Sequence, residues 1–373
     1  MKFINECMAF SKGGLLLTGL TVCIAAPFSS MAQKSEKTAK VGGAGVYELA
    51  VSESTGAVYV AAAGSRSAPG GKIYKLDPKT LAITDSIDAK DTPPFGVGIN
   101  DKTQTLYTSN TRTGSVSAVD LKSGKIVATI KNGQEKSHTR EVVVDETRNR
   151  VYVSDVGEGS SIWVIDGNTN TYLHSIENTG KTTTGLALDA EKQVLYVTNM
   201  GTNEIGVVDL EAKKLVKSYS AHGERPVNLV LDKPTGRLFV VDQGTNEVNV
   251  IKAESGELIR KIPAGKGALG IKMDPVRKRV YTANRQDGTV TVIDSDSYKV
   301  LATLEAGSAP NTVVVNTKTG AAYVTNKTKP MQRPQGGQGG GQRPQGGQGG
   351  GQEGQRPAPA PDPLGDTVTL ILP

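Results

Sequence analysis

Short apolar runs of five or six residues recur along the chain, each bounded by Gly, Asn, Asp or Pro. In a representative stretch, residues 141–145, 151–155, 161–166 and 171–176 are four such runs, rich in Val, Ile, Tyr and Thr. Segments of this length and composition are typical of β-strands, and the polar residues between them are typical of tight turns. The pattern therefore predicts an antiparallel meander of four strands in this stretch.

One of these strands carries a motif that the chain repeats. The sequence YVTN at residues 196–199 returns letter for letter at residues 323–326, and looser copies bring the number to seven. The aromatic residues of the copies lie 42 to 48 residues apart, at Tyr59, Tyr107, Tyr152, Tyr196, Phe239, Tyr281 and Tyr323. A period that holds over a whole chain indicates a repeat architecture. Seven four-stranded repeats bury both faces of every sheet when they form a ring, which predicts an all-β, seven-bladed β-propeller of four-stranded antiparallel blades.

The two ends of the chain are expected to share one blade of this ring. The seventh repeat has a first strand at 311–315 and the motif strand, and its third strand is expected at 367–372. The sequence leaves no room for a fourth strand after that. Residues 37–41 are therefore expected to supply the outer strand of blade seven, so that the N-terminal strand closes the ring.

Residues 1–32 have the pattern of a signal peptide. Two lysines precede an apolar run at 13–26, and small residues suit cleavage after Ala32. The alternative, a transmembrane anchor, needs a longer apolar run to cross about 30 Å of hydrocarbon. We therefore expect a periplasmic or secreted protein with no membrane span after cleavage and a propeller domain at 33–373. Both cysteines lie in the leader, so disulfides and thiol chemistry are not expected in the mature chain.

The largest departure from the repeat is a Gln/Gly/Pro-rich insertion at 327–363, between the second and third strands of blade seven. It contains two consecutive copies of QRPQGGQGGG and few apolar residues to bury, so we expect it to be disordered. One interpretation is a tolerated expansion of a surface loop. The other is a mobile arm for an anionic polymer or cell wall, which its excess of Lys and Arg suits.

A second departure lies where the outer strand of one blade leads into the first strand of the next. First strands line the central channel of a propeller, so these loops are expected to form its mouth, on the same face as the insertion. The positions expected there are Tyr47, Gly96, Arg140, Thr184, Val227, Leu269 and Asn311, followed by Glu48, Val97, Glu141, Gly185, Asn228, Gly270 and Thr312. Arg140 and Glu141 stand out, because most other repeats have small or neutral residues there.

We therefore place a candidate ligand site at the channel mouth, formed by Tyr47, Glu48, His138, Arg140, Glu141, Arg225, Asn228 and Asn311. A concave opening with a few convergent polar groups is the usual form of such a site. The alternative is that Arg140 and Glu141 form an internal or interblade ion pair that only satisfies the polarity of the channel.

The repeat resembles a known family. The copies LYVTN and AYVTN, with the third-strand sequences IWVID, IGVVD and VTVID, are the mark of bacterial seven-bladed YVTN propellers, and of exported YncE-like proteins in particular. The resemblance implies a binding scaffold without a settled chemistry, and some relatives are linked to DNA. Propellers with similar repeats also include lactone hydrolases and quinoprotein dehydrogenase subunits, so the fold alone does not choose an activity.

Motifs for catalysis and for cofactors are missing from the sequence. It has no GxSxG elbow, P-loop or clean dinucleotide fingerprint, and its three histidines, His138, His174 and His222, lack metal-ligand spacing. We expect a monomeric binding or scaffold protein with no catalytic residues, metal or cofactor, and with an unidentified ligand or envelope partner. One alternative is a binder of single-stranded DNA or another polyanion, which the formal net charge of +6 permits. Another is a lactonase-like hydrolase with Glu141 as base.

Overall fold

The computed structural model describes residues 33–65, 68–134, 136–156, 159–329 and 362–373. The chain divides into two units, Met1–Ala32 and Gln33–Pro373, and every described residue belongs to the second. The signal peptide and most of the insertion therefore lie outside the described residues, and both stay predictions.

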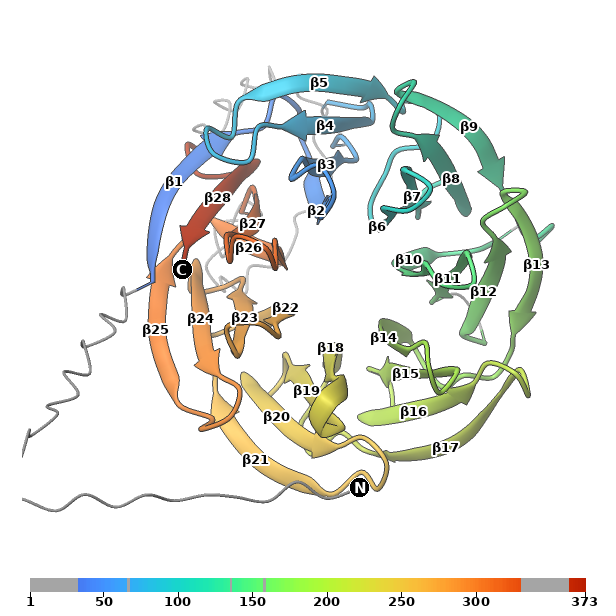
Figure 1. Ribbon diagram of the computed structural model, residues 1–373, viewed down its shortest axis with the longest axis vertical. Helices are drawn as coiled ribbons and strands as arrows, with labels where there is room; N and C mark the ends of the chain where they lie inside the picture. The colour runs from blue at the N-terminus through green and yellow to red at the C-terminus, as the bar shows by residue number, and fades with distance from the viewer. Residues whose placement is uncertain (1–32, 66–67, 135, 157–158, 330–361) are drawn as a thin grey trace, which may run out of the picture. The chain divides into compact units, whose positions relative to one another are not determined.

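In the described part of the chain, seven four-stranded antiparallel sheets surround a central channel, which confirms the predicted propeller (Figure 1). The first strand of each sheet lies at the channel and the fourth lies at the rim. Blades one to three are β2 (Val46–Val51), β3 (Val58–Ala62), β4 (Lys72–Leu76) and β5 (Ile83–Asp88); β6 (Val97–Asn100), β7 (Thr105–Asn110), β8 (Ser115–Asp120) and β9 (Lys125–Ile130); and β10 (Thr139–Asp145), β11 (Arg150–Asp155), β12 (Ser161–Asp166) and β13 (Thr171–Ile176).

The remaining blades follow the same order around the ring. Blades four and five are β14 (Thr183–Asp189), β15 (Val194–Asn199), β16 (Glu204–Asp209) and β17 (Lys214–Ser220); and β18 (Pro226–Asp232), β19 (Arg237–Asp242), β20 (Glu247–Lys252) and β21 (Leu258–Pro263), with a short 3-10 helix η1 (Lys233–Thr235) after β18. Blades six and seven are β22 (Ala268–Asp274), β23 (Arg279–Asn284), β24 (Thr289–Asp294) and β25 (Val300–Glu305); and β26 (Ala309–Val315), β27 (Ala322–Lys327), β28 (Thr367–Leu372) and β1 (Lys34–Lys40).

The N-terminal strand closes the ring, as the sequence predicted. β1 pairs with β28 in antiparallel register, from Lys34 opposite Leu372 to Lys40 opposite Thr367. β28 has the predicted bounds, while β1 begins three residues before the predicted 37–41. Blade seven therefore contains strands from both ends of the chain (Figure 1).

The hydrophobic core of the described residues consists of seven clusters, one between each pair of neighbouring blades. Between blades two and three, for example, Tyr107 and Val116 pack with Val151 and Trp163. A lone four-stranded sheet would leave both faces in water, and the ring removes both faces of every sheet from water. Burial between blades is therefore the main force that holds the ring together.

The tyrosine and the asparagine of the motif are structural residues. Tyr323 packs between blades seven and one, and its hydroxyl donates a hydrogen bond to the carbonyl of Pro78 at 2.9 Å. Asn199 is buried at the end of β15, where its Nδ2 donates to the carbonyl of Thr179 at 3.1 Å and its Oδ1 accepts from the hydroxyl of Thr183 at 2.6 Å. The asparagine thus ties the second strand to the loop that enters its blade.

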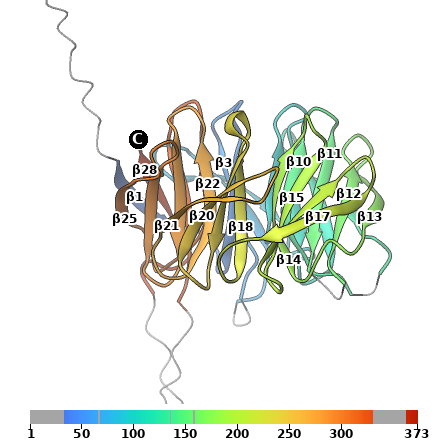
Figure 2. The same cartoon turned by 90° about the horizontal axis from the view of Figure 1, so that it is seen from below.

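Strands run between two faces of the ring, which Figure 2 shows edge-on. In an antiparallel blade, the loop that enters the first strand and the loop that joins the second strand to the third emerge on the same face. We call this face the mouth face. Lys327 and Asp362 lie on it, because they end β27 and precede β28. The structure places Lys327 in β27 rather than in the predicted insertion.

Candidate functional site: the channel mouth

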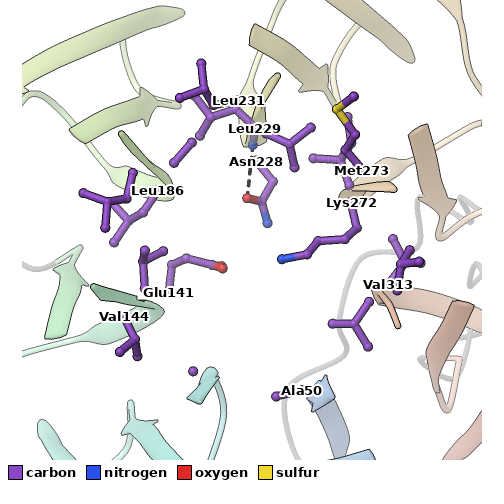
Figure 3. Close-up of a pocket in the computed structure, with 18 of the residues that line it drawn as sticks. Ala50, Glu141, Val144, Leu186, Asn228, Leu229, Leu231, Lys272, Met273 and Val313 are labelled. Atoms are coloured by element: carbon purple, nitrogen blue, oxygen red, sulfur yellow. Dashed lines mark hydrogen bonds between the residues drawn. The ribbon is translucent and has the colours of Figure 1, made fainter. Parts of the chain in front are cut away.

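The central channel contains a cavity of about 770 Å³ that all seven first strands line. Glu141 and Asn228 lie on its wall near the mouth face, and Lys272 extends into it from a position further along β22 (Figure 3). The middle of the wall is apolar, with side chains such as Leu229 and Val313. Charged residues also line the opposite end, where Asp232 and Lys233 form ion pairs with Arg237 and Glu191.

A β-bulge brings two consecutive residues of each first strand to this mouth. In six of the seven described blades, the first strand has one more residue than its partner strand near the mouth, as between Thr139 and Val142 opposite Asp155 and Val153. An extra residue interrupts the alternation of side chains and re-aims them. This explains why Arg140 lies at the mouth while Glu141 lines the channel.

The threonine of the motif holds the bulge in place and joins it to the next blade. Thr198 Oγ1 accepts a hydrogen bond from the N–H of Gly185 in the bulge at 2.8 Å and donates to the carbonyl of Val227 in the next blade at 3.0 Å. Hydroxyls at the equivalent positions make the same pair of contacts, namely Ser109, Ser154 and Thr325. Thr325 donates to the carbonyl of Tyr47 at 2.8 Å, so this contact positions a candidate site residue.

Tyr47 lies at the centre of the mouth and contacts side chains from three other blades. The ring of Phe95 lies edge-on to it, with ring centroids 5.0 Å apart. The guanidinium Cζ of Arg140 lies 5.6 Å from the centroid of the Tyr47 ring, and the Nζ of Lys327 lies 3.8 Å from it. Both cations are within the range of a cation–π interaction.

Arg285, the residue after the motif copy of blade six, joins this group through Asn311. Its guanidinium donates to Asn311 Oδ1, and Asn311 Nδ2 donates to the carbonyl of Tyr47 at 2.9 Å. The Nε of Arg285 is buried and has no hydrogen-bond partner among the described residues. We call Tyr47, Arg140, Arg285 and Lys327 the mouth cluster.

The three cations of the mouth cluster form no ion pairs in the described part of the chain, although the charges of Asp366 and Glu48 act on Lys327. Burial, together with the charges of Arg285 and Arg140, lowers the pKa of Lys327 to about 8. Burial and the charge of Arg140 also lower the pKa of Arg285. The cluster therefore carries a surplus of positive charge that a bound anion would relieve.

Two carboxylates lie next to the mouth cluster along the chain. Glu48 follows Tyr47 and Glu141 follows Arg140, and both line the channel. Glu48 accepts a hydrogen bond from the N–H of Val97 at 3.1 Å. Neither carboxylate forms an ion pair within the described residues, although the charge of Arg140 acts on both. The alternative of an internal or interblade pair formed by Arg140 or Glu141 therefore stays a prediction, as the ligand site does.

Enclosure by the ring raises the pKa of both carboxyl groups, although both side chains are only half-buried. Burial and the charge of Glu141 raise the pKa of Glu48 well above its usual range. Burial raises the pKa of Glu141 to about 7, against the opposing effects of Lys272, of Arg140 and of a hydrogen bond from Asn228. Loss of hydration disfavours the charged form of each carboxyl group, so part of the negative charge is absent near neutral pH.

The structure brings six of the eight predicted site residues together. Tyr47, Arg140 and Asn311 lie at the mouth, and Glu48, Glu141 and Asn228 line the channel. His138 and Arg225 are exposed in loops of the mouth face, and only their backbone groups have hydrogen bonds in the described part of the chain. The membership of the ligand site and the role of Glu141 as the base of a hydrolase both stay predictions.

Sequence reasoning missed four residues of the site, namely Phe95, Lys272, Arg285 and Lys327. The N–H of Gly96 donates a hydrogen bond to the hydroxyl of Ser109, as the N–H of Glu141 does to that of Ser154. Gly96 is therefore the counterpart of Glu141, and Phe95, rather than the predicted Gly96, is the counterpart of Arg140. Arg285 and Lys327 each directly follow the asparagine of a motif copy, where blades three, four and five have Val156, Met200 and Gln243. Comparing that position across the repeats is the signal that would have found them.

Two further observations limit what the described residues contain. They include no group of three or more His, Cys, Asp or Glu side chains that could hold a metal ion. Within the same residues, no helix is long and apolar enough to cross a membrane.

Comparisons with known proteins agree with this architecture. A model of the YncE-like β-propeller family matches residues 25–273. The uncharacterized protein YncE of Salmonella typhimurium is 37% identical over 329 residues, which cover 85% of this chain and 92% of that protein. YncE of Escherichia coli K12 is 39% identical over 213 residues, which cover 55% of this chain and 59% of that protein.

Among solved structures, the hydrazine synthase of Kuenenia stuttgartiensis superposes with a TM-score of 0.67 at 17% identity, covering 77% of this chain and 94% of that one. A likeness at this identity shows the fold alone. The fold and the mouth thus define a seven-bladed β-propeller with a charged channel entrance. The family match and the relatives identify it more closely: this chain belongs to the YncE-like β-propeller family.

Proposed function

We propose that this protein is an exported binding protein whose mouth cluster takes an anionic ligand. The observation that carries the proposal is the convergence of Arg140, Arg285 and Lys327 around Tyr47 without an ion pair to any described residue. Guanidinium and ammonium groups bind carboxylates and phosphates through charge-assisted hydrogen bonds. The cavity behind the mouth gives a small ligand room to enter.

A polyanion such as single-stranded nucleic acid is a second candidate ligand. Arg112 is exposed and its Cζ lies 5.3 Å from the centroid of the Phe95 ring, so the cationic surface continues from the mouth onto blade two. Arginines beside aromatic rings suit the stacking of bases and the binding of phosphates. This observation favours an extended ligand over one confined to the mouth.

Calorimetric titration with inorganic phosphate at low ionic strength tests the proposal. Lys327→Met keeps the length of the side chain but removes its charge, and we expect a loss of affinity of about tenfold because one charge-assisted contact is lost. Arg225→Ala is the matched control, since it removes an exposed cation from the same face outside the mouth cluster. Equal losses in the two variants, or no phosphate binding by the wild type, would contradict the proposal.

A ten-nucleotide thymidine oligonucleotide separates the two candidate ligands. Tighter binding than phosphate, with an affinity that falls steeply as salt is added and weakens in Arg112→Ala, would support the polyanion. Binding no tighter than that of phosphate would limit the site to small anions.

A further inference from the structure

The mouth cluster and the two channel carboxylates are neighbours on the same strands. Tyr47 precedes Glu48 in β2, and Arg140 precedes Glu141 in β10. Each first strand runs from the mouth face into the ring. A ligand that enters the mouth therefore meets three cations first and a pair of carboxylates next.

The carboxylates are not required by the architecture of the ring. The bulge positions equivalent to Glu48 and Glu141 in other blades have Gly96, Gly185 and Thr312, whose N–H groups make the same hydrogen bond to a motif hydroxyl as Glu141 does. A glycine at this place shows that the fold needs no charge there. Two half-buried carboxyl groups with raised pKa values and no ion pair within the described residues lower the stability of the folded state where they are ionised. Residues of this kind are candidates for function.

Lys272 compensates the carboxylates only in part. Its ammonium group projects into the cavity on the side opposite Glu141 (Figure 3). It opposes the rise in the pKa of Glu141 but forms no ion pair with any described residue. The charges of Arg140 and Lys327 at the mouth also act on the carboxyl groups, yet the pKa values of both stay raised. A further cationic group in this part of the channel would favour their ionised forms, and an anionic group at the mouth would favour the charged forms of the cations there.

We propose that the site binds a bipolar ligand, with its anionic group at Arg140, Arg285 and Lys327 and its ammonium group at Glu48 and Glu141. This inference rests on the proposed anion site and adds the chemical class of the ligand, an amino acid or a similar zwitterion. The ammonium group enters the channel first and the anionic group stays at the mouth. A ligand oriented in this way would give an ion-pair partner to both sets of charges, which form no ion pairs within the described residues.

Three small probes of matched length test the inference by calorimetry. 4-Aminobutyrate, pentanoate and glutarate share a carboxylate on three methylene groups, and they differ only in the other end, which is an ammonium, a methyl or a second carboxylate group. We expect 4-aminobutyrate to bind about tenfold more tightly than pentanoate, because it gains one charge-assisted contact. Glutarate should bind most weakly, because its second carboxylate would face Glu48 and Glu141.

The double variant Glu48→Gln/Glu141→Gln supplies the residue-level test. It keeps the size and most hydrogen-bonding capacity of the side chains, so its thermal unfolding temperature should be at least that of the wild type. We expect 4-aminobutyrate to lose its advantage over pentanoate, and glutarate to bind more tightly than it does to the wild type. Persistence of the wild-type order in a folded double variant would overturn the assignment of Glu48 and Glu141.

The outcomes separate the two proposals. If glutarate binds the wild type as tightly as 4-aminobutyrate does, the bipolar ligand is wrong while the anion site stands. If none of the probes binds and inorganic phosphate does not bind either, the anion site fails and the bipolar ligand fails with it.

Discussion

Two arcs of the mouth face share one framework and differ in charge at two positions, the first-strand residue at the bulge and the residue after the motif. The charged arc consists of blades six, seven, one, two and three, and it contributes Arg285, Lys327 and Arg140. The neutral arc consists of blades four and five. Its residues at the corresponding first-strand positions are Thr184 and Val227, and those after the motif are Met200 and Gln243. Both arcs contain the same β-bulge.

The comparison separates what the ring needs from what the site needs. Thr198 in the neutral arc and Thr325 in the charged arc hold the bulge and the next blade in the same way. The hydrogen bonds of the framework therefore form with or without charge at the mouth. Because the neutral arc has the same framework without these cations, the framework does not require them, and we attribute them to the ligand proposed above.

Giving the charged arc the residues of the neutral arc should have the largest effect. Arg140→Thr/Arg285→Gln introduces the residue types of Thr184 and Gln243, and we expect phosphate affinity to fall about a hundredfold through the loss of two charge-assisted contacts. Calorimetric titration measures the affinity, and thermal unfolding checks that the ring is intact. A folded double variant that keeps its affinity within about threefold would show that these cations do not bind the anion.

Asp242, in blade five of the neutral arc, is a buried carboxyl group whose ionisation destabilises the folded state. It is fully buried where four other blades have an asparagine, and burial together with the charge of Glu247 raises its pKa to about 8. An aspartate with a raised pKa stabilises the fold fully below about pH 4, and this contribution is lost as the pH rises through about 8. We therefore expect Asp242→Asn to raise the free energy of unfolding at pH 9 by on the order of 2 kcal/mol.

The matched control for this prediction is Asn199→Asp in blade four, which should lower stability over the same pH range. Urea unfolding at pH 4 and pH 9 measures both effects. Equal stability of Asp242→Asn and wild type at pH 9 would mean that the carboxyl group carries no cost in the folded state.

The motif threonines allow the framework and the site to be tested apart. Thr198→Val and Thr325→Val each leave a bulge N–H without its hydroxyl partner and remove one hydrogen bond to a carbonyl of the next blade, which should cost about 1–2 kcal/mol of stability. Only Thr325→Val removes one of the two hydrogen bonds to the carbonyl of Tyr47, so only this variant should also weaken anion binding. A similar loss of affinity in Thr198→Val would show that binding depends on the whole ring rather than on the charged arc.

The smallest expected effect is the pH dependence of pentanoate binding. Pentanoate stays charged from pH 6 to 9, while Glu141 ionises near 7 and Lys327 loses its proton near 8. Both changes make the site more negative, so affinity should fall roughly fivefold over this range. Glu141→Gln should remove the part of the decline centred near pH 7, and Lys327→Met the part near pH 8. An affinity that rises with pH would contradict the assigned charges.

The sequence was sufficient for the framework because each repeat contains the same local signals. The motif strand, the turn residues and the missing fourth strand of blade seven predicted the ring and its closure by β1. Arg140 and Glu141 were found because they depart from the repeat. Arg285 and Lys327 were missed because each follows a motif asparagine, and only the packing of blades six, seven and one shows that this position faces Tyr47.

The perturbed carboxyl groups lay beyond sequence reasoning for a related reason. The raised pKa of Glu48 depends on enclosure by the ring and on Glu141, which comes from another blade. The bulge that places Glu141 in the channel depends on pairing with β11 and on Ser154. The effect of Glu141 on Glu48 arises between two blades, and a single repeat contains only one of these residues.

The most direct test of the anion site is to locate a bound anion. Crystals of the protein soaked in selenate would show it by the anomalous scattering of selenium, since selenate has the charge and shape of the tetrahedral oxyanions that arginine and lysine bind. We predict the strongest anomalous peak at the mouth, within hydrogen-bonding distance of Arg140, Arg285 and Lys327. Selenate bound elsewhere, with no peak at a mouth that is open to solvent in the crystal, would contradict the account.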